Sequence, residues 1–102
     1  MDIKLAFAIA LKKVRKVRRL TQEDFSDTSS RTYISTLERG KKSITLEKLE
    51  QLAQTLRIHP LTLLAITYAN VDSNIGIKEL LRMIEVEVDD INGNQAKSVT
   101  SI

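Results

Sequence analysis

Two neighbouring stretches decide the fold of this chain: TQEDF at residues 21–25 and RTYISTLERG at residues 31–40. Thr21 has the identity of a helix N-cap, and Asp24, three residues later, has that of its capping-box partner. We therefore predict a short helix that begins after Thr21 and extends to about residue 27.

The second stretch has an apolar side and a polar side. Ile34 and Leu37 lie three residues apart, which places them on one face of a helix, and polar side chains occupy the other face. The polar run at residues 26–30 resists helix formation, because its short side chains compete for backbone hydrogen bonds, and Ser29 or Ser30 is the expected N-cap of the next helix. Two short helices joined in this way have the build of a helix-turn-helix, whose second helix lies in the major groove of DNA.

Helical patterns continue on both sides of this motif. Gly40 stands where a left-handed residue ends a helix, Thr45 has the identity of an N-cap, and Pro60 suits the first position of a helix. We predict further helices over residues 3–19 and 46–56 and a helix from Pro60 onward. Their expected core positions are Phe7, Ala10, Leu11, Val14 and Val17; Leu46, Leu49, Leu52, Ala53 and Leu56; and Leu61, Leu64 and Ala65.

The predicted fold class is therefore all-α, with a five-helix domain at residues 1–69 and a C-terminal part at residues 70–102. The C-terminal part is expected to contain a linker from Asn70 to Asn74, an amphipathic helix over residues 77–91 and a polar, frayed tail from Gly93.

Charge is distributed unevenly along the 102 residues. Residues 1–57 hold 13 Lys and Arg against 7 Asp and Glu, a balance of +6, whereas residues 58–102 have a balance of −3. A basic first half predicts a polyanionic partner, although charge alone is equally compatible with a solvated surface. No apolar run approaches the roughly 20 residues of a membrane span, and there is no cysteine or signal-peptide pattern, so we expect a cytoplasmic protein that does not enter a membrane.

The ordered set of motifs resembles the lambda-repressor-like, Xre-type helix-turn-helix family over about residues 5–66. The matching residues are Leu11, Val14 and Arg15; Leu20 to Phe25; Tyr33 to Ser35; Leu37 to Gly40; and Leu46 to Ala53. The resemblance implies double-stranded DNA as the partner and an internal ion pair between Arg15 and Glu38.

The resemblance also implies which residues contact DNA. Gln22 would bond a phosphate or bridge to a base-contacting residue, and Arg31 would read a base, because a guanidinium can bond O6 and N7 of guanine together. Lys41 and Lys42 would hold the backbone and set affinity rather than sequence preference. The whole expected set is Thr21, Gln22, Ser30, Arg31, Thr32, Tyr33, Ser35, Thr36, Arg39, Lys41 and Lys42.

The helix over residues 77–91 carries a continuous apolar stripe. Its expected role is homodimerisation, because proteins of this build commonly bind two half-sites about 34 Å apart as dimers. The alternative, that the helix folds back on its own core, is equally compatible with the pattern. The expected dimerisation residues are Ile77, Leu80, Leu81, Ile84 and Val88.

No residue pattern in the sequence indicates catalysis, a metal or a cofactor. His59 stands alone beside a proline and suits a surface or capping role, and the adjacent Glu23 and Asp24 point apart on a helix. We therefore expect no enzyme and no small-molecule substrate. The predicted function is a sequence-specific transcriptional regulator, most simply a repressor, that binds a palindromic operator as a homodimer. The alternatives are a restriction-modification controller protein, an antitoxin, or a protein-protein interaction module.

Overall fold

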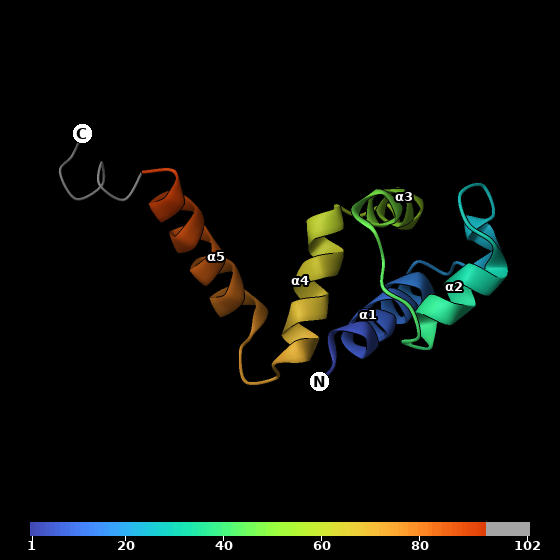
Figure 1. Cartoon of the computed structure of the whole chain (residues 1–102), viewed down its shortest axis with the longest axis horizontal. Helices are drawn as coiled ribbons and strands as arrows, with labels where there is room; N and C mark the ends of the chain where they lie inside the picture. Colours follow the sequence, from blue (N-terminus) through green and yellow to red (C-terminus); the bar gives the residue numbers. More distant parts are fainter. Residues whose placement is uncertain (94–102) are drawn as a thin grey trace.

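The computed structural model describes residues 1–93, which form helices joined by short loops (Figure 1). In chain order these are α1 (Ile3–Val17), the 3₁₀ helix η1 (Gln22–Phe25), α2 (Arg31–Glu38), α3 (Leu46–Leu56), α4 (Pro60–Val71) and α5 (Ile77–Ile91). Residues 1–93 contain no strand, so the all-α fold class is confirmed. Across the same residues, no helix is both long and apolar enough to span a membrane. Most of the expected tail lies outside the described residues.

Local sequence signals set most of the helix ends. The hydroxyl of Ser30 accepts a hydrogen bond from the Tyr33 backbone N–H at 3.0 Å, which identifies Ser30 as the N-cap of α2. Thr45 caps α3 in the same manner, and His59 caps α4 immediately before Pro60. These capping predictions are confirmed, because each depends only on contacts within one helical turn.

The core lies where η1 and α1 to α4 meet. Phe25, Ile34 and Leu37 are fully buried, so the two helices of the central motif are held to the rest of the domain by apolar side chains. The buried cluster at the centre of this core consists of Phe7, Ala10, Leu11, Phe25, Ile34, Leu37, Leu49, Leu52, Leu56 and Leu63. This packing fixes the position of α2 relative to α1 and α3.

Three apolar residues predicted to face the core are exposed instead. Val17 is 70% exposed at the last turn of α1, and Leu46 is 78% exposed at the first turn of α3. Leu61 is 65% exposed, whereas Leu63 and Thr67 provide the buried side of α4. The reason for the error on α4 is that this helix is apolar around most of its circumference, so periodicity alone cannot select the buried face.

Three predicted boundaries are also wrong. Helix α1, predicted over residues 3–19, ends at Val17, because Arg19 has a left-handed backbone conformation. The first helix of the motif is only the short 3₁₀ helix η1, because the chain turns after Phe25, whose carbonyl oxygen accepts hydrogen bonds from the N–H groups of Thr28 and Ser29. The linker predicted from Asn70 begins at residue 72, because α4 continues to Val71. The Asn70 side chain donates a hydrogen bond to the Ala6 carbonyl at 3.2 Å, which ties the end of α4 to α1.

Helix α5 leans away from the rest of the molecule, and α4 and α5 form a V in Figure 1. The molecule is therefore elongated, with dimensions of 53 × 28 × 22 Å. No residue of α5 is buried. Within one copy of the chain, α5 therefore does not fold back into the core.

Candidate nucleic-acid interface

Helix α2 presents one polar side to solvent. Ile34 and Leu37 are fully buried beneath it, and Arg31 and Thr32 are exposed at its first turn. Because the apolar residues hold α2 to the core, the exposed side chains project from a rigid element. A helix presented in this way has the geometry required for entry into a major groove.

A buried ion pair connects α2 to α1. The Arg15 guanidinium donates hydrogen bonds to both carboxylate oxygens of Glu38, at 2.6 and 2.9 Å, and a third to the Leu20 carbonyl at 2.9 Å. The two side chains are only 12% and 4% exposed. The hydrogen bond to Glu38 raises the pKa of Arg15 above its ordinary value, against the opposing effect of burial. The ion pair implied by the family resemblance is thus confirmed.

Gln22 is joined to this ion pair. Its side-chain N–H₂ donates a hydrogen bond to Glu38 at 3.1 Å, and the side chain is partly buried at the start of η1. Thr21 is exposed one residue earlier, where its backbone N–H donates to the Asp24 carboxylate at 2.6 Å. Glu38 therefore orients Gln22, and one amide hydrogen of Gln22 is already used within the protein.

The second half of α2 has its own internal hydrogen bonds. The Thr36 hydroxyl donates to the Thr32 carbonyl at 2.8 Å. The Arg39 guanidinium donates to the Ser35 carbonyl at 3.3 Å and to the Thr36 hydroxyl at 3.4 Å. Thr36 can therefore offer a neighbouring base its methyl group more readily than its hydroxyl hydrogen, whereas the side chains of Arg31 and Thr32 are exposed at the first turn.

Two lysines lie close to the ring of Tyr33. The ammonium nitrogens of Lys42 and Lys48 are 5.3 and 5.4 Å from the ring centroid, within the range of cation–π attraction. Partial burial raises the pKa of the Tyr33 phenol. Lys48 also donates hydrogen bonds to the Thr28 carbonyl and the Ser29 hydroxyl, so it secures the turn that precedes α2. The sequence reasoning assigned no role to Lys48, since only the fold brings residues 28 and 48 together.

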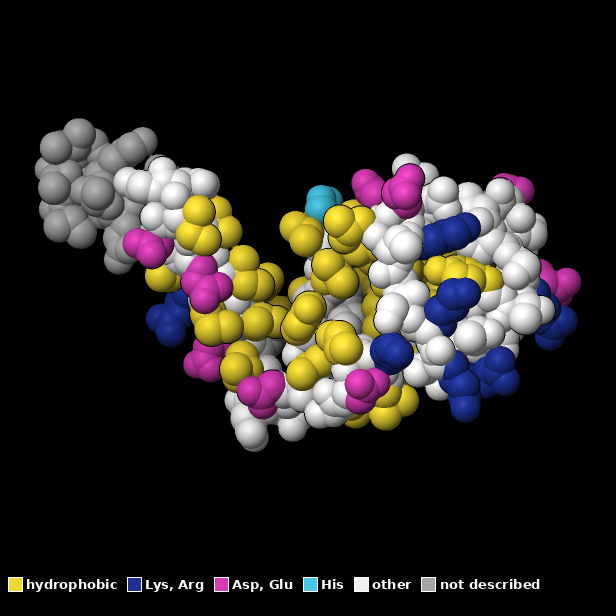
Figure 2. Space-filling model, viewed as in Figure 1, with side chains coloured by type: hydrophobic (Ala, Val, Ile, Leu, Met, Phe, Trp, Pro, Cys, Tyr) yellow, Lys and Arg dark blue, Asp and Glu magenta, His cyan; other side chains and the backbone are white. Residues whose placement is uncertain are grey.

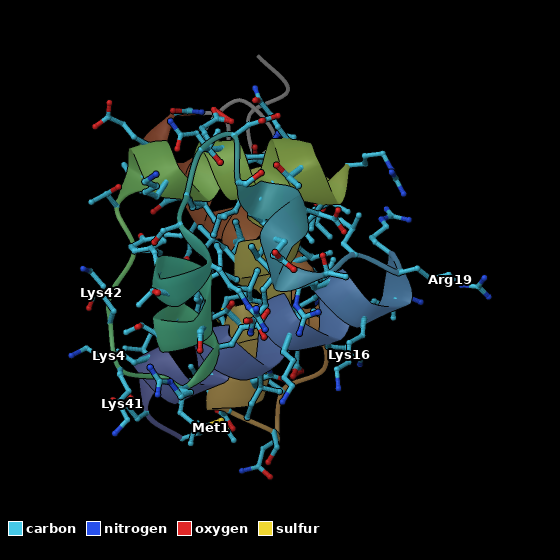
Figure 3. The ribbon with its side chains drawn as sticks, turned by 90° about the vertical axis from the view of Figure 1, so that its right-hand side faces the viewer. Met1, Lys4, Lys16, Arg19, Lys41 and Lys42 are labelled. Atoms are coloured by element: carbon cyan, nitrogen blue, oxygen red, sulfur yellow. The ribbon has the colours of Figure 1, made fainter. Side chains whose placement is uncertain are left out.

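Lysines from distant parts of the sequence share one edge of this face (Figure 3). Lys4, Lys41 and Lys42 lie together beside α2, whereas Lys16 and Arg19 lie at the opposite edge of the same view. Lys4 and Lys42 line a common pocket, which places the first turn of α1 next to the loop after α2. Lys4 was not predicted as a site residue, because its link to Lys41 and Lys42 exists only in the tertiary structure.

The predicted DNA-binding residues thus lie along η1, α2 and the adjoining loops, and the Ser30 hydroxyl oxygen already accepts one hydrogen bond as the α2 N-cap. The predicted dimerisation residues lie elsewhere, on α5, at the opposite end of the molecule in Figure 1. The two predicted surfaces are therefore physically separate.

Comparison with known proteins agrees with this geometry. The helix-turn-helix family model matches residues 11–63, which include η1, α2 and α3. The chain belongs to the lambda-repressor-like, Xre-type helix-turn-helix family. This is a family of DNA-binding regulators and not a family of enzymes.

Two individual relatives are informative. The control protein C.MunI from a Mycoplasma species is 42% identical over 60 residues, which cover 56% of this chain and 81% of that protein. The restriction-modification controller protein C.Esp1396I was solved as a tetramer in complex with its natural 35 base-pair operator. Its structure matches with a TM-score of 0.62 and 25% identity, covering 70% of this chain and 96% of that chain.

Proposed function

We infer that this protein is a sequence-specific DNA-binding transcriptional regulator that binds a palindromic operator as a homodimer. The observation that carries the proposal is α2, whose exposed first turn is held rigidly by buried apolar residues and by the Arg15–Glu38 ion pair. In this proposal the DNA-binding domain is residues 1–69, residues 70–102 serve self-association, and repression is the simplest outcome. The protein acts in the cytoplasm and has no enzymatic activity.

The proposed DNA-binding residues have two roles: some recognise the base sequence, and others set the affinity for any duplex. Arg31 reads a base edge, because its guanidinium is exposed at the first turn of α2, and Thr32 adds a weaker contact beside it. Lys41 and Lys42, together with Lys4 from α1, neutralise phosphates along one edge of the groove. Gln22, oriented by Glu38, approaches a phosphate at the start of η1.

Fluorescence anisotropy with duplexes from the region upstream of the gene, beside scrambled duplexes at several salt concentrations, tests the proposal. We expect a subset of duplexes to bind tightly at physiological salt. Arg31→Ala should cost about 1–3 kcal/mol on that subset and relax sequence preference, whereas Lys41→Ala should weaken binding to all duplexes alike and reduce the salt dependence. Equal and steeply salt-sensitive binding of the wild type to every duplex would instead favour a protein-interaction module.

A more specific candidate is a controller protein of a restriction-modification system. It is favoured by the similarity to C.MunI and C.Esp1396I, both of which are described as control or controller proteins. Deletion of the gene should then change the transcription of neighbouring restriction and methyltransferase genes. A change confined to a neighbouring toxin gene would identify an antitoxin.

Helix α5 is the proposed dimerisation element. No member of its stripe of Ile77, Leu80, Leu81, Ile84 and Val88 is fully buried within the chain, and only Leu80 is partly buried. In Figure 2 hydrophobic side chains gather along α5 and on the side of α4 that faces it. A second copy could cover this apolar surface. Helix α5 also has five acidic residues against two basic ones, which disfavours DNA as its partner.

A further inference from the structure

The apolar surface that α4 and α5 share is a cleft. It has a volume of 370 Å³, and its lining includes Leu61, Leu64 and Tyr68 from α4 and Leu80, Leu81 and Ile84 from α5. Leu61 is 65% exposed and Tyr68 is 53% exposed. An open cleft with such walls is unfavourable in water, because its apolar area remains hydrated.

Both walls of the cleft have apolar surface that the rest of the chain leaves uncovered. Helix α4 has no charged residue in its 12 positions, a composition typical of a helix that is covered on all sides. Leu63 and Thr67 of α4 are fully buried, and Leu64 and Ile66 pack against the core while remaining partly exposed. Helix α5 is amphipathic and has no fully buried residue, so its own chain covers its apolar side only in part.

The sequence of α5 indicates what fills the cleft. Ile77, Leu81, Ile84, Val88 and Ile91 are separated by four, three, four and three residues, the heptad spacing of a helix that packs against another helix of the same kind. These five side chains are all exposed, by at least 40%. A second α5 has the same pattern and can therefore interlock with the first.

Charges flanking the heptad seam determine the orientation. Lys78 and Glu85 are seven residues apart and occupy equivalent flanking positions beside the seam. In an antiparallel pair, this flanking position faces its equivalent in the other helix, so Lys78 lies opposite Glu85 twice by symmetry. In a parallel pair these residues do not meet. Within residues 1–93, neither side chain has an ion-pair partner in its own chain.

We propose that a second copy of this chain inserts its α5 into the α4–α5 cleft, antiparallel to the first α5, with Lys78 of each copy paired to Glu85 of the other. The contact is isologous, so each copy fills the cleft of the other. The α4 and α5 helices of both copies then form a four-helix cluster that covers Leu61 and Leu81. The inference rests on the proposed homodimeric function, and it adds which helix fills the cleft and in which direction that helix runs.

Charge reversal combined with analytical ultracentrifugation tests the arrangement. Lys78→Glu and Glu85→Lys should each raise the dissociation constant of the dimer about tenfold, because two attractive contacts become repulsive. The double variant Lys78→Glu/Glu85→Lys should return to within about threefold of wild type, because the pair is restored with its signs exchanged. Glu79→Lys is the matched control, since it makes the same charge change as Glu85→Lys on the side of α5 away from the seam, and it should leave the constant unchanged.

A folding control and a separate DNA-binding assay distinguish the possible outcomes. Circular dichroism should show the same helix content for all variants, because the changed residues are exposed on α5. A double variant no tighter than the single variants, or a wild type that stays monomeric at every concentration, would overturn the inference. The proposed DNA-binding function fails separately, if wild-type protein does not distinguish its operator from scrambled duplexes. A dimer that binds its operator but ignores these charges would contradict the antiparallel arrangement alone.

Discussion

Breaking the Arg15–Glu38 ion pair should strongly destabilise the protein. In Arg15→Met, the Glu38 carboxylate remains buried and loses both bonds from the guanidinium, which leaves the Gln22 amide as its remaining hydrogen-bond partner. Removal of one partner from a buried pair costs about 3–5 kcal/mol, because the other charge is left uncompensated. A domain of this size has a free energy of unfolding of only about 5–15 kcal/mol. The expected loss therefore lies between about a fifth of that free energy and all of it.

Urea unfolding followed by circular dichroism at neutral pH measures this cost. With a urea dependence of about 1–2 kcal/mol per molar, a cost of about 3–5 kcal/mol should lower the midpoint by about 1.5–5 M. Lys13→Met is the matched control, because it removes a positive charge from an exposed position on the same helix and should change the free energy of unfolding by less than about 0.5 kcal/mol.

A double-mutant cycle separates the pair from its surroundings. Arg15→Met/Glu38→Leu removes both charges together, so it should recover most of the stability lost in Arg15→Met, because no buried charge is left without a partner. A midpoint for Arg15→Met that matches the Lys13→Met control would refute the reasoning. It would show that the ion pair contributes no more than an exposed surface charge.

Three other perturbations have defined outcomes. Gly40→Ala should cost about 1–2 kcal/mol in a thermal melt, because Gly40 has φ +70° and an added Cβ would lie 3.3 Å from the main chain of α1. In a Tyr68→Phe background, the absorbance of the Tyr33 phenolate should titrate with a midpoint above 10.0, because burial raises the pKa of Tyr33. The contribution of Tyr33 to stability is complete below pH 10.0 and is lost as the pH rises through the raised pKa, and a midpoint at or below 10.0 would contradict the assigned burial. Leu81→Asp should lower the dimer fraction in sedimentation, and an unchanged profile would count against α5 as the dimer contact.

Features that depend on a single helical turn could be predicted from the sequence. Ser30, Thr45 and Pro60 mark helix starts through contacts with residues one to three positions away, and Gly40 ends α2 because its backbone conformation favours glycine. The bounds of α5 were also correct, since its apolar stripe runs unbroken from Ile77 to Ile91. In each case, the interactions that decide the structure are local in the chain.

Most of the candidate interface could likewise be located, because the motif and the exposed positions of α2 follow from helical periodicity. The family resemblance, rather than the periodicity, supplied the pairing of Arg15 with Glu38, which are 23 residues apart. Lys4 and Lys48 were missed for the same physical reason, because their neighbours at the interface come from distant parts of the chain.

By itself, the sequence determined the helices, their caps and the position of the helix-turn-helix, because hydrogen bonding within a turn and apolar periodicity are encoded locally. Only the tertiary structure decided which side of α4 is buried, since a helix that is apolar almost all round can pack through several faces and its neighbours choose among them. The tertiary structure likewise separated α5 from the core, because Leu63 and Thr67 occupy the inward side of α4 and leave its outer side to face α5 across an open cleft.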